Sequence, residues 1–303
     1  MKNSQINALV KIAETGSIRA AARQMNLSQS ALTRAMRELE EEVGAELIMR
    51  SYRGVTFTPA GHAVLKRARL ILETIDRALD EVRQITGGSG AKVTIGVTPV
   101  IATTLLPLIY GQFIQTMPDA ELTLSEGLLT GIVPELLEGR LDFGVAIATQ
   151  KELPQELVFN PLFDIDCCAA GRIGHPLSGQ TDWTTLANGR WILNLTPGSS
   201  ASYLLSWLDQ QGLPRPERLV KCSSTLLMVE MMRRTDLIGF GPSLLLKDSL
   251  ASAGLATFDI EPVPPQISLG IVRVRGVPIT PAAQFLETLF LRQAASATGS
   301  VNS

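Results

Sequence analysis

The 303-residue chain contains little cysteine and histidine, and this scarcity excludes several kinds of chemistry. Its three cysteines, Cys167, Cys168 and Cys222, are an odd number with two of them adjacent, so neither a disulfide framework nor a metal clip is indicated. Neither of the two histidines, His62 and His175, can be paired from the sequence with a serine or cysteine nucleophile. We therefore expect no catalytic residue, no metal site and no cofactor, and do not expect an enzyme.

The sequence also lacks the features of a signal peptide and of a membrane span. Residues 1–16 mix charged residues into an amphipathic pattern, and no apolar core ends there in a cleavage site. The stretch from Val93 to Pro118 carries no charged residue, but prolines, glycines and polar residues interrupt it. A buried strand followed by a buried helix is therefore favoured. We expect a cytoplasmic protein that does not contact a membrane.

The charge of the chain is small overall but unevenly distributed. With 27 Lys and Arg against 29 Asp and Glu, the net charge is −2. Residues 1–92 hold 14 basic and 10 acidic residues, a net charge of +4, whereas the remainder holds 13 basic and 19 acidic residues, a net charge of −6. This distribution predicts that only the N-terminal part meets a polyanion.

Three short helices are predicted before residue 44. The first is amphipathic and ends at Gly16, Ser17 caps the second (IRAAARQM), and Ser28 caps the third (QSALTRAMRELEEEV). Asn26, a residue that tolerates left-handed backbone, interrupts the chain between the second and third helices. The short interval between these two helices has the length of a helix-turn-helix turn.

A small wing and a long helix are predicted next. Apolar and β-branched residues surround the turn at Arg53-Gly54, which favours two short strands, and Thr58-Pro59 begins a helix that continues to Ile85. This helix carries apolar residues at heptad spacing: Val64, Ala68, Ile71, Ile75, Ala78 and Val82. The seam can pack on its own domain or on a second copy of the chain; we favour a homodimer because the pattern lasts for three heptads.

Beyond a glycine-rich linker at residues 87–90, strands alternate with helices. KVTIGV, ELTLSEG and LDFGVAIA read as strands, and a similar alternation recurs after residue 162. The pattern predicts parallel, doubly wound sheets in two α/β lobes.

The third helix has the side chains that a DNA major groove accepts. Glutamine pairs with adenine, arginine pairs with guanine, and threonine offers a hydroxyl or a methyl group. The outward residues near the start of this helix are Gln29, Ser30, Thr33, Arg34 and Arg37. Phosphate or minor-groove contacts are predicted for Ser17, Ser28, Arg50 and Arg53. An ordinary solvated charged face is the alternative interpretation.

Residues 1–85 resemble the DNA-binding head and linker helix of LysR-type transcriptional regulators. The matching run extends from TGSIRAAARQMNLSQS to TFTPAG, and looser matches follow in EGLLTGIVPELLEGRLDFGVA, in His175-Pro176-Leu177 and in GFGPS. The chain departs from the family at Ser30, where proline is usual, and at Ile48, where phenylalanine is usual. At Leu129 the family often has a small hydroxyl residue.

The resemblance implies a fold and a domain division. The fold is an α+β winged helix-turn-helix with a long linker helix, followed by a two-lobed α/β effector domain of the periplasmic-binding-protein type 2-like class. The implied parts are residues 1–58 (winged helix), 59–86 (linker and dimerisation helix), 87–90 (hinge), 91–161 with 267–303 (first lobe) and 162–266 (second lobe).

The resemblance also places a small-molecule effector between the lobes. The predicted contacts are Thr98, Pro99, Ile101, Leu129, Thr130, Ile147, Thr196, Pro197 and Ser199. Because helix starts attract anions without a fixed positive charge, we expect a small organic acid. For each of these residues, a helix cap or a core position is the alternative.

The sequence thus predicts a transcriptional regulator that binds double-stranded promoter DNA as a homodimer and responds to this effector. The resemblance further implies a homotetramer and allows RNA polymerase as a partner. Cys167 and Cys168 have a redox-sensing interpretation, since such family members exist, but a buried pair on a strand is favoured. The competing class is an α/β solute-binding or enzymatic protein with a helical interaction appendage.

Overall fold

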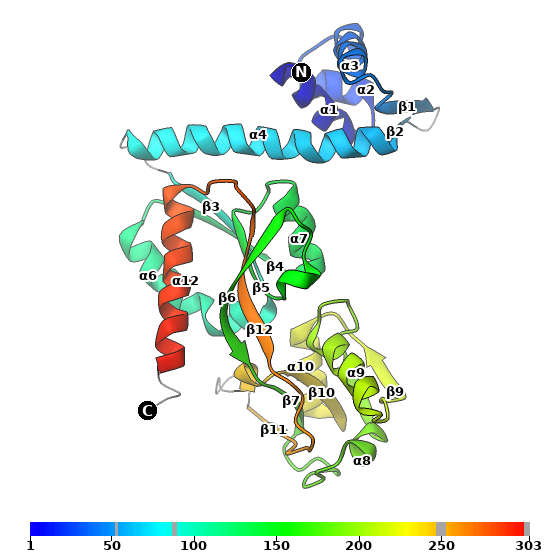
Figure 1. Ribbon diagram of the computed structural model, residues 1–303, viewed down its shortest axis with the longest axis vertical. Helices are drawn as coiled ribbons and strands as arrows, with labels where there is room; N and C mark the ends of the chain where they lie inside the picture. Colours follow the sequence, from blue (N-terminus) through cyan, green and yellow to red (C-terminus); the bar gives the residue numbers. More distant parts are fainter. Residues whose placement is uncertain (52–53, 87–89, 247–252, 300–303) are drawn as a thin grey trace. The chain divides into compact units, whose positions relative to one another are not determined.

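The computed structural model describes residues 1–51, 54–86, 90–246 and 253–299. The chain divides into two compact units, Met1–Gly88 with Glu135–Arg140, and Ser89–Pro134 with Leu141–Ser303. Figure 1 shows the elements of both. No helix in the described part of the chain is long and apolar enough to cross a membrane.

The N-terminal unit begins with helices whose ends follow from local chemistry. They are α1 (Asn3–Thr15), α2 (Ile18–Gln24) and α3 (Gln29–Val43). Gly16 ends α1 in the left-handed conformation at φ 65°, and Asn26 adopts φ 54° in the turn before α3. The hydroxyls of Ser17 and Ser28 accept from the amides of Ala20 and Ala31 at 3.4 and 3.1 Å, so both predicted caps are present.

The antiparallel wing consists of β1 (Ile48–Ser51) and β2 (Gly54–Phe57), and α4 (Pro59–Ile85) follows it. The Thr58 hydroxyl caps α4 by accepting from the Gly61 amide at 2.9 Å. A Cβ atom at Gly61 would lie 1.9 Å from the Leu47 carbonyl oxygen, so only glycine lets α4 start this close to the wing.

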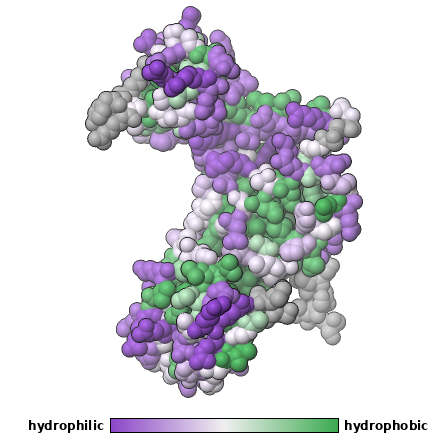
Figure 2. Space-filling model, turned by 180° about the vertical axis from the view of Figure 1, so that it is seen from behind, coloured by the Kyte–Doolittle hydropathy of each residue, from purple (hydrophilic) through white to green (hydrophobic). Residues whose placement is uncertain are grey.

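The core of this unit buries part of the heptad seam of α4 and leaves the rest of it exposed. Leu32, Met36 and Leu39 of α3 are fully buried with residues of α1, α2 and the start of α4. Ala68 is also fully buried there, and Val64 packs against the same core. These two seam residues therefore pack on their own domain, as the alternative interpretation held, because the first three turns of α4 cover the three-helix core. Figure 2 shows hydrophobic surface along the remaining, C-terminal part of α4.

The second unit contains two five-stranded sheets among the described residues. The first has the order β4-β3-β5-β12-β6, formed by β3 (Lys92–Val97), β4 (Glu121–Glu126), β5 (Phe143–Ile147), β6 (Leu157–Ile165) and β12 (Ile267–Val274). One of its faces is covered by α5 (Pro99–Thr104), α6 (Leu106–Thr116) and α12 (Pro281–Gly299). On the other face lies α7 (Leu129–Leu137), whose Ile132 approaches Gly96 of β3.

The second sheet has the order β11-β7-β10-β8-β9. Its strands are β7 (Cys167–Arg172), β8 (Arg190–Leu193), β9 (Arg218–Lys221), β10 (Leu237–Pro242) and β11 (Leu255–Thr257). The described helices of this lobe are α8 (Trp183–Ala187), α9 (Ser200–Gln211) and α10 (Thr225–Arg234). The unit also contains the short 3₁₀ turns η1 (Gln150–Glu152) and η2 (Ser243–Leu246).

Two details differ from the sequence prediction. The sheets are mixed and not purely parallel, because β12 runs antiparallel to β5 and β6, and β7 runs antiparallel to β10 and β11. In addition, β6 continues past the expected crossing point at Pro161 and pairs Ile165 with Ile267 of β12. Pro161 lies at a register shift on this edge strand, a position where a sheet accepts proline, so it does not end the strand.

Candidate functional site

The predicted base-reading residues lie on the outer side of α3. Gln29, Ser30, Arg34 and Arg37 are exposed and Thr33 is half-buried, while Leu32 and Met36 enter the core. The side chain of Arg34 is 83 % exposed. The start of α3 therefore presents the hydrogen-bonding groups that a major groove can pair with.

Glu38 forms an ion pair with Arg34, one turn before it on α3. Its carboxylate accepts from Arg34 Nε at 2.9 Å, and a second approach comes from Gln5 Nε2 at 3.5 Å. This short contact uses Nε and not the terminal nitrogens of the guanidinium. That terminal pair is the part of arginine that matches O6 and N7 of guanine.

Two other side chains have roles that the sequence did not reveal. Ser30, which stands where the family has proline, places its hydroxyl 3.0 Å from that of Ser28, so the cap and the neighbouring hydroxyl are linked. Glu40 turns inward, and its carboxylate accepts from the amides of Leu47 and Ile48 at 2.8 and 3.2 Å. It anchors the start of the wing and is not one more solvated acid on α3.

The remaining predicted DNA contacts are less fully described. Ser17 is half-buried at the start of α2. Arg50 lies in β1, but its side chain is not described, and Arg53 falls outside the described residues.

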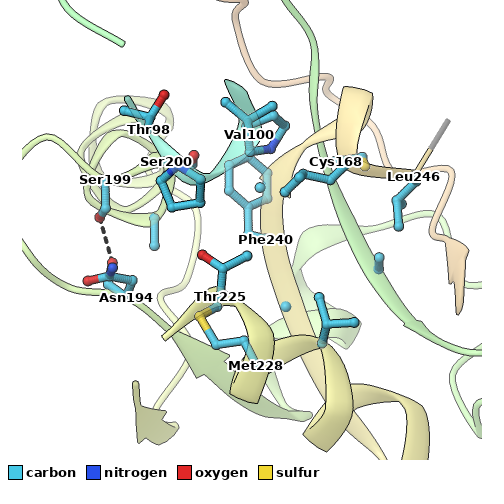
Figure 3. Close-up of a pocket in the computed structure, with 18 of the residues that line it drawn as sticks. Thr98, Val100, Cys168, Asn194, Ser199, Ser200, Thr225, Met228, Phe240 and Leu246 are labelled. Atoms are coloured by element: carbon cyan, nitrogen blue, oxygen red, sulfur yellow. Dashed lines mark hydrogen bonds between the residues drawn. The ribbon is translucent and has the colours of Figure 1, made fainter. Parts of the chain in front are cut away.

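The second candidate site is a cavity in the effector unit, lined by residues of both lobes. Without the solvent-open space at its mouth, the cavity has a volume of about 120 Å³. Figure 3 shows Thr98, Asn194, Ser199 and Ser200 toward one side of it and Cys168 and Leu246 toward the other.

Four predicted effector residues line this cavity: Thr98, Pro99, Ile147 and Ser199. The other five do not. Ile101 is fully buried in the first lobe, because the turn of α5 after Pro99 points it into the core. Leu129 is buried beside its neighbour Leu128, which lines the cavity in its place, and Thr130 is exposed outside it. Thr196 and Pro197 lie in the loop before the cap of α9, of which Asn194 and Ser199 reach the cavity.

Sequence reasoning missed the wall that α10 and the second sheet contribute. Met228, Val229 and Met232 come from α10, and Gly241 and Leu255 come from β10 and β11. A stripe of methionine and leucine on an amphipathic helix has the pattern of a core, and nothing in its spacing shows that part of it borders a cavity.

Two helices begin at the cavity wall. Ser200 and Ala201 occupy the first two positions of α9, and Thr225 occupies the first position of α10, where a helix has no carbonyl partner for its amides. The Ser199 hydroxyl accepts from the Ser202 amide at 3.1 Å and donates to the Asn194 carbonyl at 2.5 Å (Figure 3). This bond fixes the turn that aims the start of α9 at the cavity.

Cys167 and Cys168 alternate on β7, so one side chain enters the core and the other borders the cavity. Burial, with a smaller effect of the Cys168 thiol and the Asp166 carboxylate, raises the pKa of Cys167 to about 12. Burial and Asp166 raise the pKa of Cys168 to about 11. Both groups are therefore thiols at neutral pH, which favours the structural interpretation over redox sensing.

A side-chain bond also joins the two lobes. The Tyr203 hydroxyl of α9 donates to the Glu152 carboxylate of η1 at 2.7 Å, and burial and this carboxylate raise the pKa of the phenol. No group of three or more His, Cys, Asp and Glu side chains in the described ranges is placed to hold a metal ion.

A helix-turn-helix head with a wing, followed by two α/β lobes around a cavity, defines a ligand-responsive DNA-binding regulator. Residues 4–62 match the family model "Bacterial regulatory helix-turn-helix protein, lysR family", and residues 86–295 match the model "LysR substrate binding domain". The chain belongs to the LysR family: it is a DNA-binding transcriptional regulator with an effector-binding domain. Because the family consists of regulators, the competing interpretation as a solute-binding protein or enzyme was wrong.

Relatives and solved structures agree with this assignment. The transcriptional regulator TdcA of Escherichia coli is 26% identical over 237 residues, which cover 78% of this chain and 76% of TdcA. Full-length CbnR in complex with its target DNA is 22% identical with a TM-score of 0.67, and covers 97% of this chain and 100% of that one. ArgP from Mycobacterium tuberculosis is 18% identical with a TM-score of 0.75, covering 97% of this chain and 98% of that one. The two structures show that the fold is the same.

Proposed function

We propose that this regulator binds operator DNA as a homodimer, reads bases with the first half of α3, and responds to a small organic acid bound in the cavity of its effector domain. The outward side chains of α3, Arg34 above all, carry the first part of this proposal. The acidic second half of α3 would repel phosphates, so only its start enters the groove.

The exposed end of α4 supports the homodimer. Ile71, Ile75, Leu79, Val82 and Ile85 are between 37 % and 74 % exposed, which is unusual for large apolar side chains at helical spacing. A second copy of the helix would bury them. Two such heads would place the two α3 helices in successive major grooves of a partly palindromic site. A tetramer and a contact with RNA polymerase stay predictions that come from the family resemblance.

The helix starts at the cavity support an acidic effector. The starts of α9 and α10 both line the cavity, and helix N-termini attract anions through their amides and dipoles. Thr98, Asn194 and Ser200 add further hydrogen-bonding groups beside them. A carboxylate therefore has donors here without an arginine or lysine.

Replacing Arg34 with alanine tests base reading. The Arg34→Ala variant should lose about 1–3 kcal/mol of binding to its operator and accept other bases at one position, because a bidentate contact is removed. Fluorescence anisotropy with the operator, with each single-base variant and with random DNA measures this. Arg83→Ala, which removes an exposed arginine from α4, is the matched control. An equal loss on random DNA would show that Arg34 contacts only phosphate.

A further inference from the structure

The cavity wall is chemically uneven. Hydrogen-bonding groups lie where α5, α9 and α10 begin, and an apolar wall is formed by Met228, Met232, Leu246 and Leu255. Figure 3 shows Cys168 and Leu246 on the side away from Thr98, Asn194 and Ser199, and Met228 next to Thr225. A ligand that fills the cavity therefore meets polar groups with one end and hydrocarbon and sulfur with the other.

None of the described residues lining the cavity carries a charge at neutral pH. Cys168 is the one ionisable side chain among them, and its raised pKa of about 11 keeps it a neutral thiol. A charged group pushed toward the apolar wall would lose its hydration and find no partner, which is costly. The wall thus disfavours a second carboxylate on the ligand.

The apolar wall also leaves open space. A Cβ atom at Gly239 would lie 2.4 Å from the sulfur of Met232, so that position of β10 is filled by the methionine. Two residues further along the same face of the strand, a Cβ atom at Gly241 would meet no atom of the described residues within 4 Å. Because Gly241 lines the cavity, this space is room for a ligand.

We infer that the effector is a monocarboxylic acid with a hydrocarbon body, whose carboxylate lies at the start of α9 and whose body lies against Met228, Met232 and the open space at Gly241. The inference rests on the proposed function, which makes the effector an organic acid, and adds the chemistry of its other end. Methionine side chains are flexible and polarisable, so the wall adapts to straight and to aromatic bodies.

A series of acids measures the contribution of the hydrocarbon body. Isothermal titration of the full-length protein with propionate, butyrate, hexanoate and octanoate should show affinity rising about three- to fourfold per methylene until the cavity is full. Adipate, the dicarboxylate with the length of hexanoate, should bind at least tenfold more weakly than hexanoate. Equal affinity along the series, or tighter binding of adipate, would overturn the inference.

Two variants locate the body of the ligand. Gly241→Val fills the open space. It should lower the affinity for hexanoate at least tenfold and change the affinity for propionate by no more than about twofold. Gly111→Val in α6, where a Cβ atom also meets no atom, is the matched control and should change neither. Met228→Gln keeps the side-chain length and should also weaken hexanoate but not propionate; it serves as the test if Gly241→Val does not fold. If a folded Gly241→Val or Met228→Gln variant binds hexanoate with unchanged affinity, the hydrocarbon body does not lie where we infer.

Hexanamide separates this inference from the proposed function. If hexanamide binds as tightly as hexanoate and the chain-length dependence persists, the apolar wall is as inferred but the effector is not an acid. If the acids bind and chain length has no effect, the effector is an acid and the inference fails. If no member of the series binds, both are wrong.

Discussion

The recognition surface and the effector cavity of this regulator are built in opposite ways. The surface lies on one helix, α3, which buries one face in the core and exposes the other face to solvent. The cavity draws its walls from at least six elements, spread from Thr98 to Leu255. One site is polar, exposed and continuous in sequence, and the other is largely apolar and assembled from distant segments.

This difference predicts which sites depend on assembly. In the proposed homodimer, a single α3 reads only half of a palindromic operator, so DNA binding would need a second chain. The cavity is complete within one effector unit, so ligand binding does not. Substitutions that separate the chains should therefore affect the two functions very unequally.

The largest effect is expected for Ile75→Asp in the exposed seam of α4. The side chain of Ile75 is 39 % exposed, and a charge there would have to be buried between two helices. The variant should sediment as a monomer and lose about 100-fold or more in operator affinity, because two half-sites no longer act together. Effector affinity should stay within about twofold.

Thr74→Asp is the control for this variant, since it adds the same charge at an exposed neighbouring position outside the seam. It should leave both sedimentation and operator binding close to those of the parent protein. An unaltered sedimentation profile for Ile75→Asp would refute the seam, and a parallel loss of effector binding would break the comparison between the two sites.

Matched serine caps offer a finer test. Ser28 caps α3 and Ser199 caps α9, each accepting from an amide at 3.1 Å. Ser28→Ala should cost about 1 kcal/mol in the free energy of unfolding. Ser199→Ala should cost about 1–3 kcal/mol more, because it also leaves the Asn194 carbonyl without its hydroxyl partner.

Urea denaturation measures both losses, and binding assays assign them. Operator affinity should fall only in Ser28→Ala and effector affinity only in Ser199→Ala. Threonine at either position keeps the cap and should restore most of the loss. If operator affinity and effector affinity both fall in one of the alanine variants, the lost cap has destabilised the whole protein and not one site alone.

The head could be predicted almost completely because its structure follows from neighbours in sequence. The Ser17, Ser28 and Thr58 caps, the left-handed Gly16 and Asn26 and the wing are each set by a few adjacent residues. What the sequence did not reveal there is the inward turn of Glu40 and the burial of Ala68. Both depend on which helix face meets the rest of the domain, and a heptad pattern is the same for either partner.

The cavity could be predicted only in part. Thr98, Pro99 and Ser199 were found because helix starts at strand ends mark ligand sites in α/β folds. Ile101 was predicted to line the cavity but lies in the core. Which face of α5 points to the cavity depends on how the helix is rotated on the sheet, and the sequence does not determine that rotation. The α10 wall was missed because Met228 and Met232 meet the cavity only through tertiary packing. Pro161 was taken for a lobe boundary because the register shift that accommodates it is set by the neighbouring strand.

The smallest effect is expected at Cys168, and labelling it reports on the cavity alone, because the head contains no cysteine. In a Cys222→Ser background, alkylation at pH 7 should be far slower than that of glutathione. The rate should rise about tenfold per pH unit toward pH 11, since burial raises the Cys168 pKa to about 11 and only the thiolate reacts. Hexanoate should slow it further by covering the thiol.

The raised pKa of Cys168 also determines how the stability of the protein depends on pH. The folded protein holds the proton of Cys168 more tightly than the unfolded chain, whose thiol has a pKa near 9.0. Stability from this group is therefore complete below pH 9 and is lost as the pH rises from there through about 11. Cys168→Ser should remove that part of the alkaline loss while leaving operator binding at pH 7 unchanged. Rapid alkylation of Cys168 at pH 7 would mean a reactive thiolate in the cavity, and the redox interpretation of this cysteine would then replace the structural one.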